Sequence, residues 1–169
     1  MKRPFTRQEA IKDLSMLGIK EPQIYLLDII PLVEMMWADG ELQQSELALL
    51  DGYVCKRVRQ INEIAGYAVI DPQDAQAFAR RFTMQKPLPE LLRMLRSLIG
   101  PSILSSSDSS YVDSVLKLMI EACIDIAANA VREYPYGLHD RFDSKEKNCF
   151  FEILKTIIDF KRPDRVNEK

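Results

Sequence analysis

The residues most capable of chemistry in this chain are acidic side chains set against apolar helices. The first group runs from Glu34, in an apolar segment, through Asp39 in a polar turn to Glu46 at the start of the next segment. An aspartate just after a helix C-terminus gains nothing from the helix dipole, so a bound cation would compensate its charge. The alternative is a plain turn, in which Gly40 takes the left-handed conformation and Asp39 bonds its own backbone.

A second acidic group lies in the C-terminal half. Glu121 and Asp125 are four residues apart in an otherwise apolar segment, so they share one face of a helix. An ionised carboxylate in such surroundings must be paired, coordinated or exposed. One interpretation places Glu34 opposite Asp125 across a helical bundle. The other leaves the acidic stripe facing water, or facing an arginine such as Arg57 or Arg132.

A polar turn before the last helix adds the only histidine of the chain. Imidazole is a common metal ligand, and carboxylate oxygens suit calcium, magnesium or manganese; zinc would join them if the histidine takes part. The spacing is neither that of an EF-hand nor that of a ferritin-like di-iron centre. The sequence thus predicts one divalent-metal site, whose candidate ligands are Glu34, Asp39, Glu46, Asp125, His139, Asp143 and Glu146.

These residues must be positioned by helices, because apolar residues recur at helical spacing and no alternating strand pattern is present. Helices are expected to begin at the Thr6 capping box, at Pro22, before Leu47, at Asp71–Pro72, after Pro89, at Ser109 and at Asp143. Pro31 should bend the second of these helices, and Gly100–Pro101 should end the fifth. The serine-rich segment 102–110 should then be a linker.

We therefore predict an all-α fold, a compact bundle of about six or seven helices around two central apolar helices, 22–38 and 109–133. The whole chain, 1–169, forms one domain, with a core over 5–160 and a frayed tail over 161–169. Aligning Glu46 with Glu146 suggests a pseudo-repeat of helical hairpins, although two similar hairpins can also arise without duplication.

The composition is that of an ordinary soluble protein, with 47% hydrophobic and 28% charged residues. A net charge of -2 argues against nucleic acid as a partner, and Arg93 with Arg96 indicates a solvated face. Cys55, Cys123 and Cys149 are widely spaced among apolar residues, which is typical of buried, reduced thiols in a cytoplasmic protein. No apolar run approaches the roughly 20 residues of a membrane span, so any membrane association would be peripheral.

The segment from Glu34 through Ala38-Asp39-Gly40 to Glu46 resembles the TerB family of tellurite-resistance proteins. The hallmark of that family is an acidic residue, a few apolar residues, Ala-Asp-Gly, and a glutamate in the first turn of the next helix. The resemblance extends over most of residues 5–160. It implies a compact helical bundle whose clustered acidic residues bind divalent metal, associated with stress and tellurite resistance.

Carried over by position, Glu34, Asp39 and Glu46 match the first motif, whereas Asp125 and Glu146 match the second half more loosely. The second turn departs from the family, because it has an extended loop in place of Ala-Asp-Gly.

Our first hypothesis is a non-enzymatic, divalent-metal-binding helical module of a stress-response system that acts through contacts with partner proteins. Metal would order the turns that join the central helices and so change partner binding. The alternatives are a structural or adaptor bundle without metal and, less favoured, a metal-dependent hydrolase. The sequence leaves the oligomeric state open.

Overall fold

The computed structural model describes residues 6–132 and 144–161. Within these ranges the chain forms seven α-helices, one 3₁₀-helix and one π-helix, and no strand, which confirms the predicted all-α class. The elements are α1 (Arg7–Met16), η1 (Gln23–Ile29), α2 (Ile30–Trp37), α3 (Gln44–Ala65), α4 (Pro72–Arg80), α5 (Pro89–Ile99), η2 (Gly100–Leu104), α6 (Ser109–Arg132) and α7 (Ser144–Lys161). None of these helices is long and apolar enough to cross a membrane.

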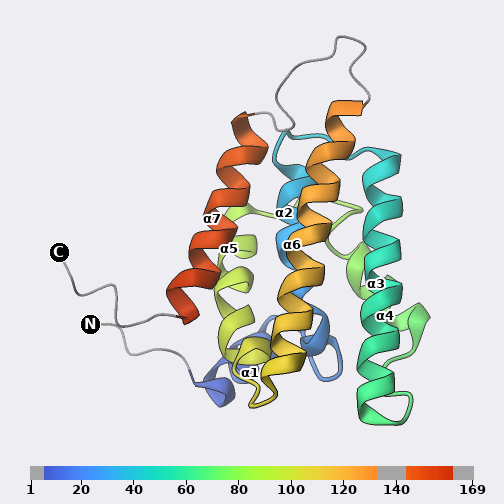
Figure 1. The fold of residues 1–169 in the computed structure, drawn as a ribbon, viewed down its shortest axis with the longest axis vertical. Helices are drawn as coiled ribbons and strands as arrows, with labels where there is room; N and C mark the ends of the chain where they lie inside the picture. Colours follow the sequence, from blue (N-terminus) through green and yellow to red (C-terminus); the bar gives the residue numbers. More distant parts are fainter. Residues whose placement is uncertain (1–5, 133–143, 162–169) are drawn as a thin grey trace, which may run out of the picture.

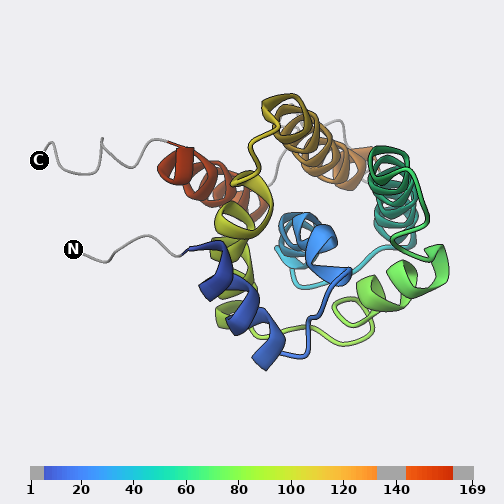
Figure 2. The ribbon, with the colours of Figure 1, turned by 90° about the horizontal axis from the view of Figure 1, so that it is seen from below.

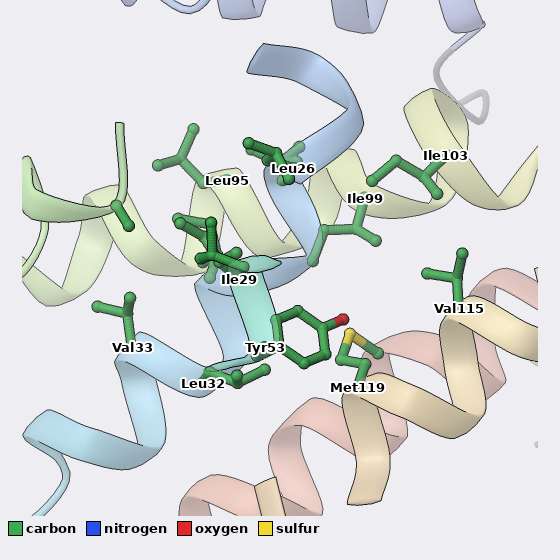
Figure 3. Packing of buried hydrophobic residues seen from close by; sticks show 14 of the residues in the cluster. Leu26, Ile29, Leu32, Val33, Tyr53, Leu95, Ile99, Ile103, Val115 and Met119 are labelled. Atoms are coloured by element: carbon green, nitrogen blue, oxygen red, sulfur yellow. The ribbon is translucent and has the colours of Figure 1, made fainter. Parts of the chain in front are cut away.

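The centre of the bundle is the continuous segment formed by η1 and α2, which the other helices surround (Figures 1 and 2). Every residue from Ile30 to Met36 is buried, as expected for a helix that is apolar on nearly all sides. Figure 3 shows side chains of α3, α5, η2 and α6 converging on this segment. The predicted central position of residues 22–38 is therefore confirmed.

The helix α6 packs against α2 along one face only. Val115, Met119 and Cys123 on that face are buried, whereas Glu121 and Asp125 are exposed on the opposite face. Residues 109–132 thus form a long amphipathic helix beside the central one.

Local capping signals begin two helices where the sequence predicts them. The hydroxyl of Thr6 accepts a hydrogen bond from the backbone N–H of Glu9, whose carboxylate accepts one from the N–H of Thr6 at 2.8 Å. The carboxylate of Asp71 accepts hydrogen bonds from the N–H groups of Gln73 and Asp74 at the start of α4. Such caps satisfy the first N–H groups of a helix, which have no partner within the helix itself.

Two proline-containing segments differ from the prediction. Residues 22–38 are not one bent α-helix: the chain is a 3₁₀-helix up to Ile29, and α2 begins at Ile30, so that Pro31 lies in its first turn. Proline is tolerated there because its missing N–H would have no partner in that turn. Gly100–Pro101 does not end the fifth helix either, since the chain continues as the π-helix η2, in which Ser102 is buried. The predicted linker therefore covers only the residues after Leu104.

Candidate functional site

The turn between α2 and α3 has the geometry of a plain polar turn. Gly40 takes φ of 92°, and its N–H donates to the carbonyl of Trp37 at 2.9 Å. Asp39 accepts a hydrogen bond from the N–H of Glu41 at 3.1 Å through Oδ1. Both features of the turn interpretation are therefore confirmed. They leave the other carboxylate oxygen of Asp39, and further lone pairs, for a cation.

Glu46 lies in the first turn of α3, as the sequence predicts, and its side chain is fully buried. Its Oε2 accepts a hydrogen bond from the N–H of Gln43 at 3.2 Å, so the carboxylate caps the start of the helix. The preceding residue, Ser45, accepts a hydrogen bond from the amide of Asn129 on α6 at 2.5 Å. This bond connects the start of α3 to the last part of α6.

Glu34 points toward α5 and α7 and is paired there with an arginine. Arg96 Nη1 donates to Glu34 Oε1 at 2.9 Å, and Nη2 lies 3.8 Å from an oxygen of Glu152. Desolvation by burial raises the pKa of Glu34 from 4.5 to about 7, although Arg96 acts in the opposite direction. Desolvation therefore outweighs the ion pair.

The position of Arg96 corrects one prediction. It is buried, at 9% exposure, and does not belong to a solvated basic face with Arg93. Its pairing with Glu34 was not predicted, because Arg57 and Arg132 were suggested only as partners of the acidic stripe on the sixth helix. The helical spacing of Arg93 and Arg96 does not distinguish their surroundings, because only Arg96 faces α2.

A second buried ion pair involves a residue that the sequence pattern did not single out. Asp28, in η1, is fully buried and accepts hydrogen bonds from Arg57 Nε at 2.7 Å and from the hydroxyl of Tyr53. Arg57 also donates to the carbonyl of Tyr25 and to the hydroxyl of Tyr111. The sequence does contain a signal for this buried pair, because Asp28, like Glu34, is a carboxylate inside an apolar segment.

The acidic stripe of α6, formed by Glu121 and Asp125, faces water. Asp125 and Glu121 are both exposed, whereas Glu34 is buried against Arg96 of α5. The interpretation in which the acidic stripe faces water is therefore confirmed for Glu121 and Asp125. The interpretation that places Glu34 opposite Asp125 is wrong.

At one end of the bundle α2 and α6 end and α3 and α7 begin (Figure 1). Glu146 is in the first turn of α7 and is buried, like Glu46 in α3. His139 and Asp143 lie outside the described residues. Among residues 6–132 and 144–161, no three His, Cys, Asp or Glu side chains are grouped so that they could hold a metal ion.

The cysteines differ from one another in environment. Burial raises the pKa of the Cys123 thiol, and burial together with Glu34 raises that of Cys149 to about 12. These two thiols are therefore protonated and poorly nucleophilic at neutral pH. Cys55 is exposed on α3 and Cys149 is half-buried, so the prediction that all three are buried is confirmed only for Cys123. The stripe of α3 that faces the core passes through Val54 and Val58 and leaves Cys55 on the outer face.

No family model matches this chain, and the curated proteins and solved structures give no match to it either. The fold and these contacts define an all-α helical bundle with two buried ion pairs. The end of the bundle that carries the buried Glu46 and Glu146 is called the acidic end below. Its resemblance to the TerB family remains a prediction.

Proposed function

We propose that this protein is a non-enzymatic helical module that binds a divalent cation at the acidic end of the bundle and acts through contacts with partner proteins. Its resemblance to the TerB family suggests a stress-response system of the tellurite-resistance type. We place the module in the cytoplasm, because an exposed free thiol such as Cys55 is typical of a reducing compartment.

The observation that carries this proposal is the pair of buried glutamates Glu46 and Glu146. Each lies in the first turn of a helix, and the two helices begin at the same end of the bundle (Figure 1). The N-terminal dipoles of α3 and α7 favour negative charge at these positions. A divalent cation bound near them, with Asp39 in the adjoining turn, would favour it further.

The chemistry of the donors is consistent with magnesium, calcium or manganese. Magnesium is often held by one or two carboxylates together with several waters, so it does not require three protein ligands. Glu34 is not included in this proposal, because its Oε1 is bonded to Arg96.

Thermal unfolding in the presence of calcium, magnesium, manganese or zinc tests the proposal. A cation that binds only the folded protein raises the melting temperature in a concentration-dependent way. Asp39→Asn and Glu146→Gln should remove that increase, and His139→Ala and Asp143→Asn test the two ligands outside the described residues. Glu121→Gln is the matched control, because Glu121 is exposed on α6 and should leave the increase intact.

The second candidate is an adaptor bundle without metal, and the Glu34–Arg96 ion pair favours it. In that case the acidic side chains are caps and ion pairs only. Melting curves that are the same with and without each of the four cations would reject the first candidate and leave the adaptor bundle ahead.

A further inference from the structure

A small cavity borders Glu34, a residue that the proposed cation site does not include. It has a volume of about 250 Å³ and lies between α2, α5, α7 and the segment that precedes α5. Since a water molecule occupies about 30 Å³ of liquid, this volume corresponds to a ligand of roughly eight non-hydrogen atoms.

The inner wall of the cavity carries a buried carboxylate with unused bonding capacity. Glu34 is only 8% exposed and borders the cavity, and its Oε2 has no hydrogen-bond partner in the described protein, whereas Oε1 is bonded to Arg96. The torsion that orients a carboxylate is broad and nearly two-fold, so either oxygen can turn toward the cavity while the other remains on Arg96. Buried polar atoms in proteins are nearly always hydrogen-bonded, which makes this position receptive to a donor group.

The rim of the cavity carries cations. Lys86 and Arg93 border it and are both exposed, and Arg93 reaches Glu90 only at 3.5 Å. Arg96 also borders the cavity, beside the carboxylates of Glu34 and Glu152, so the positive charge at the rim comes from the exposed Lys86 and Arg93. This charge favours an anionic group at the rim.

The remaining walls are largely apolar. Trp37, Leu92, Pro87 and Pro89 border the cavity between the buried carboxylate and the rim. The indole N–H of Trp37 donates to the carbonyl of Phe82 at 2.9 Å, which holds the ring in place. Small-molecule sites commonly combine such apolar walls with a few convergent polar groups.

We propose that this cavity binds an amino-acid-sized zwitterion. The ammonium group of the ligand would donate to Glu34, its carboxylate would lie against Lys86 and Arg93, and its carbon chain would lie against Trp37 and Leu92. Burial raises the pKa of Glu34 to about 7, and an ammonium ion in contact with the carboxylate would lower that pKa again.

The single tryptophan of the chain provides a direct readout, since its indole N–H gives one NMR signal at the cavity. We would titrate the protein, in the presence of a chelator, with leucine and γ-aminobutyrate, and with butyrate and butylammonium as analogues that carry one charge each. The proposal predicts a saturable shift of the Trp37 indole signal with a zwitterion, and at least tenfold weaker binding of both single-charge analogues.

Two variants and a control locate the site. Glu34→Gln should weaken binding of the zwitterion at least tenfold, and Lys86→Gln should do so without affecting folding, because Lys86 is exposed. Lys117→Gln, exposed on α6 and away from the cavity, should have no effect. Three outcomes would overturn the proposal: no saturable shift with either zwitterion, butyrate binding as tightly as γ-aminobutyrate, or equal weakening by Lys86→Gln and Lys117→Gln. The chelator keeps the result independent of cation binding.

Discussion

Replacing Glu34 by glutamine should change how the stability of the protein depends on pH. In the folded protein the pKa of Glu34 is raised from 4.5 to about 7 by desolvation, against the opposing effect of Arg96. Between these two pH values the unfolded chain has released the proton while the folded protein retains it. The free energy of unfolding should therefore fall as pH rises through this interval, because the unfolded state binds fewer protons.

The size of the effect follows from the shift. At about 1.4 kcal/mol for each pH unit, the raised pKa corresponds to a loss of about 3 kcal/mol between pH 4 and pH 8. Because Glu34 is only 8% exposed, solvent screening reduces this value little. Glutamine has nearly the shape of protonated glutamate and does not titrate. The variant should match the wild type near pH 4 and be more stable than it by about 3 kcal/mol near pH 8.

Urea unfolding of both proteins from pH 4 to pH 8 measures this difference. Glu152→Gln is the matched control, because Glu152 lies near the same arginine but its side chain is 64% exposed. The control should keep most of the wild-type pH dependence, because burial raises the pKa of Glu34 more than Glu152 does. A stability difference between Glu34→Gln and the wild type that is constant with pH would refute the reasoning. So would a wild type that gains stability relative to the variant as pH rises, since Arg96 would then lower the pKa more than burial raises it.

Two further predictions concern packing of the core. Arg57→Met leaves Asp28 as a buried charge without its cation, so urea unfolding should show a loss of about 3–5 kcal/mol in the free energy of unfolding. Arg59→Gln, at an exposed position, should change that free energy by less than about 0.5 kcal/mol. Equal losses in the two variants would contradict the role of the buried pair. Gly100→Ala should cost about 1–3 kcal/mol, because a Cβ there would overlap the ring of Phe160. Gly52→Ala in α3, with open space around it, should stabilise the protein by about 1 kcal/mol. A stabilising Gly100→Ala would show that Phe160 yields without cost.

Local signals were the part of the structure that could be read directly from the chain. Each helix cap involves residues no more than three positions apart in the sequence. The structure has the caps at Thr6 and Asp71 where they were predicted. The prolines were harder to interpret. Pro31 lacks an N–H, but whether the chain bends or changes to another helix type depends on the packing around it.

The sequence identified the acidic residues of the candidate site but not which of them are buried or paired. Glu34 and Asp125 are both carboxylates in apolar helices, yet one is buried beside Arg96 and the other is exposed. Which face of a helix is covered depends on its neighbours, and the sequence does not name them. For the same reason Arg96 was expected on the surface and Cys55 in the interior.

The sequence by itself determined the all-α class, the caps and the central position of residues 22–38, because helical periodicity and apolar content act locally and additively. Only the tertiary structure decided which charges are paired. Asp28 meets Arg57 across 29 positions and Glu34 meets Arg96 across 62, and such pairs form only when packing brings distant helices together. Desolvation then sets the pKa of Glu34, since burial is a property of the assembled core and not of the residue alone.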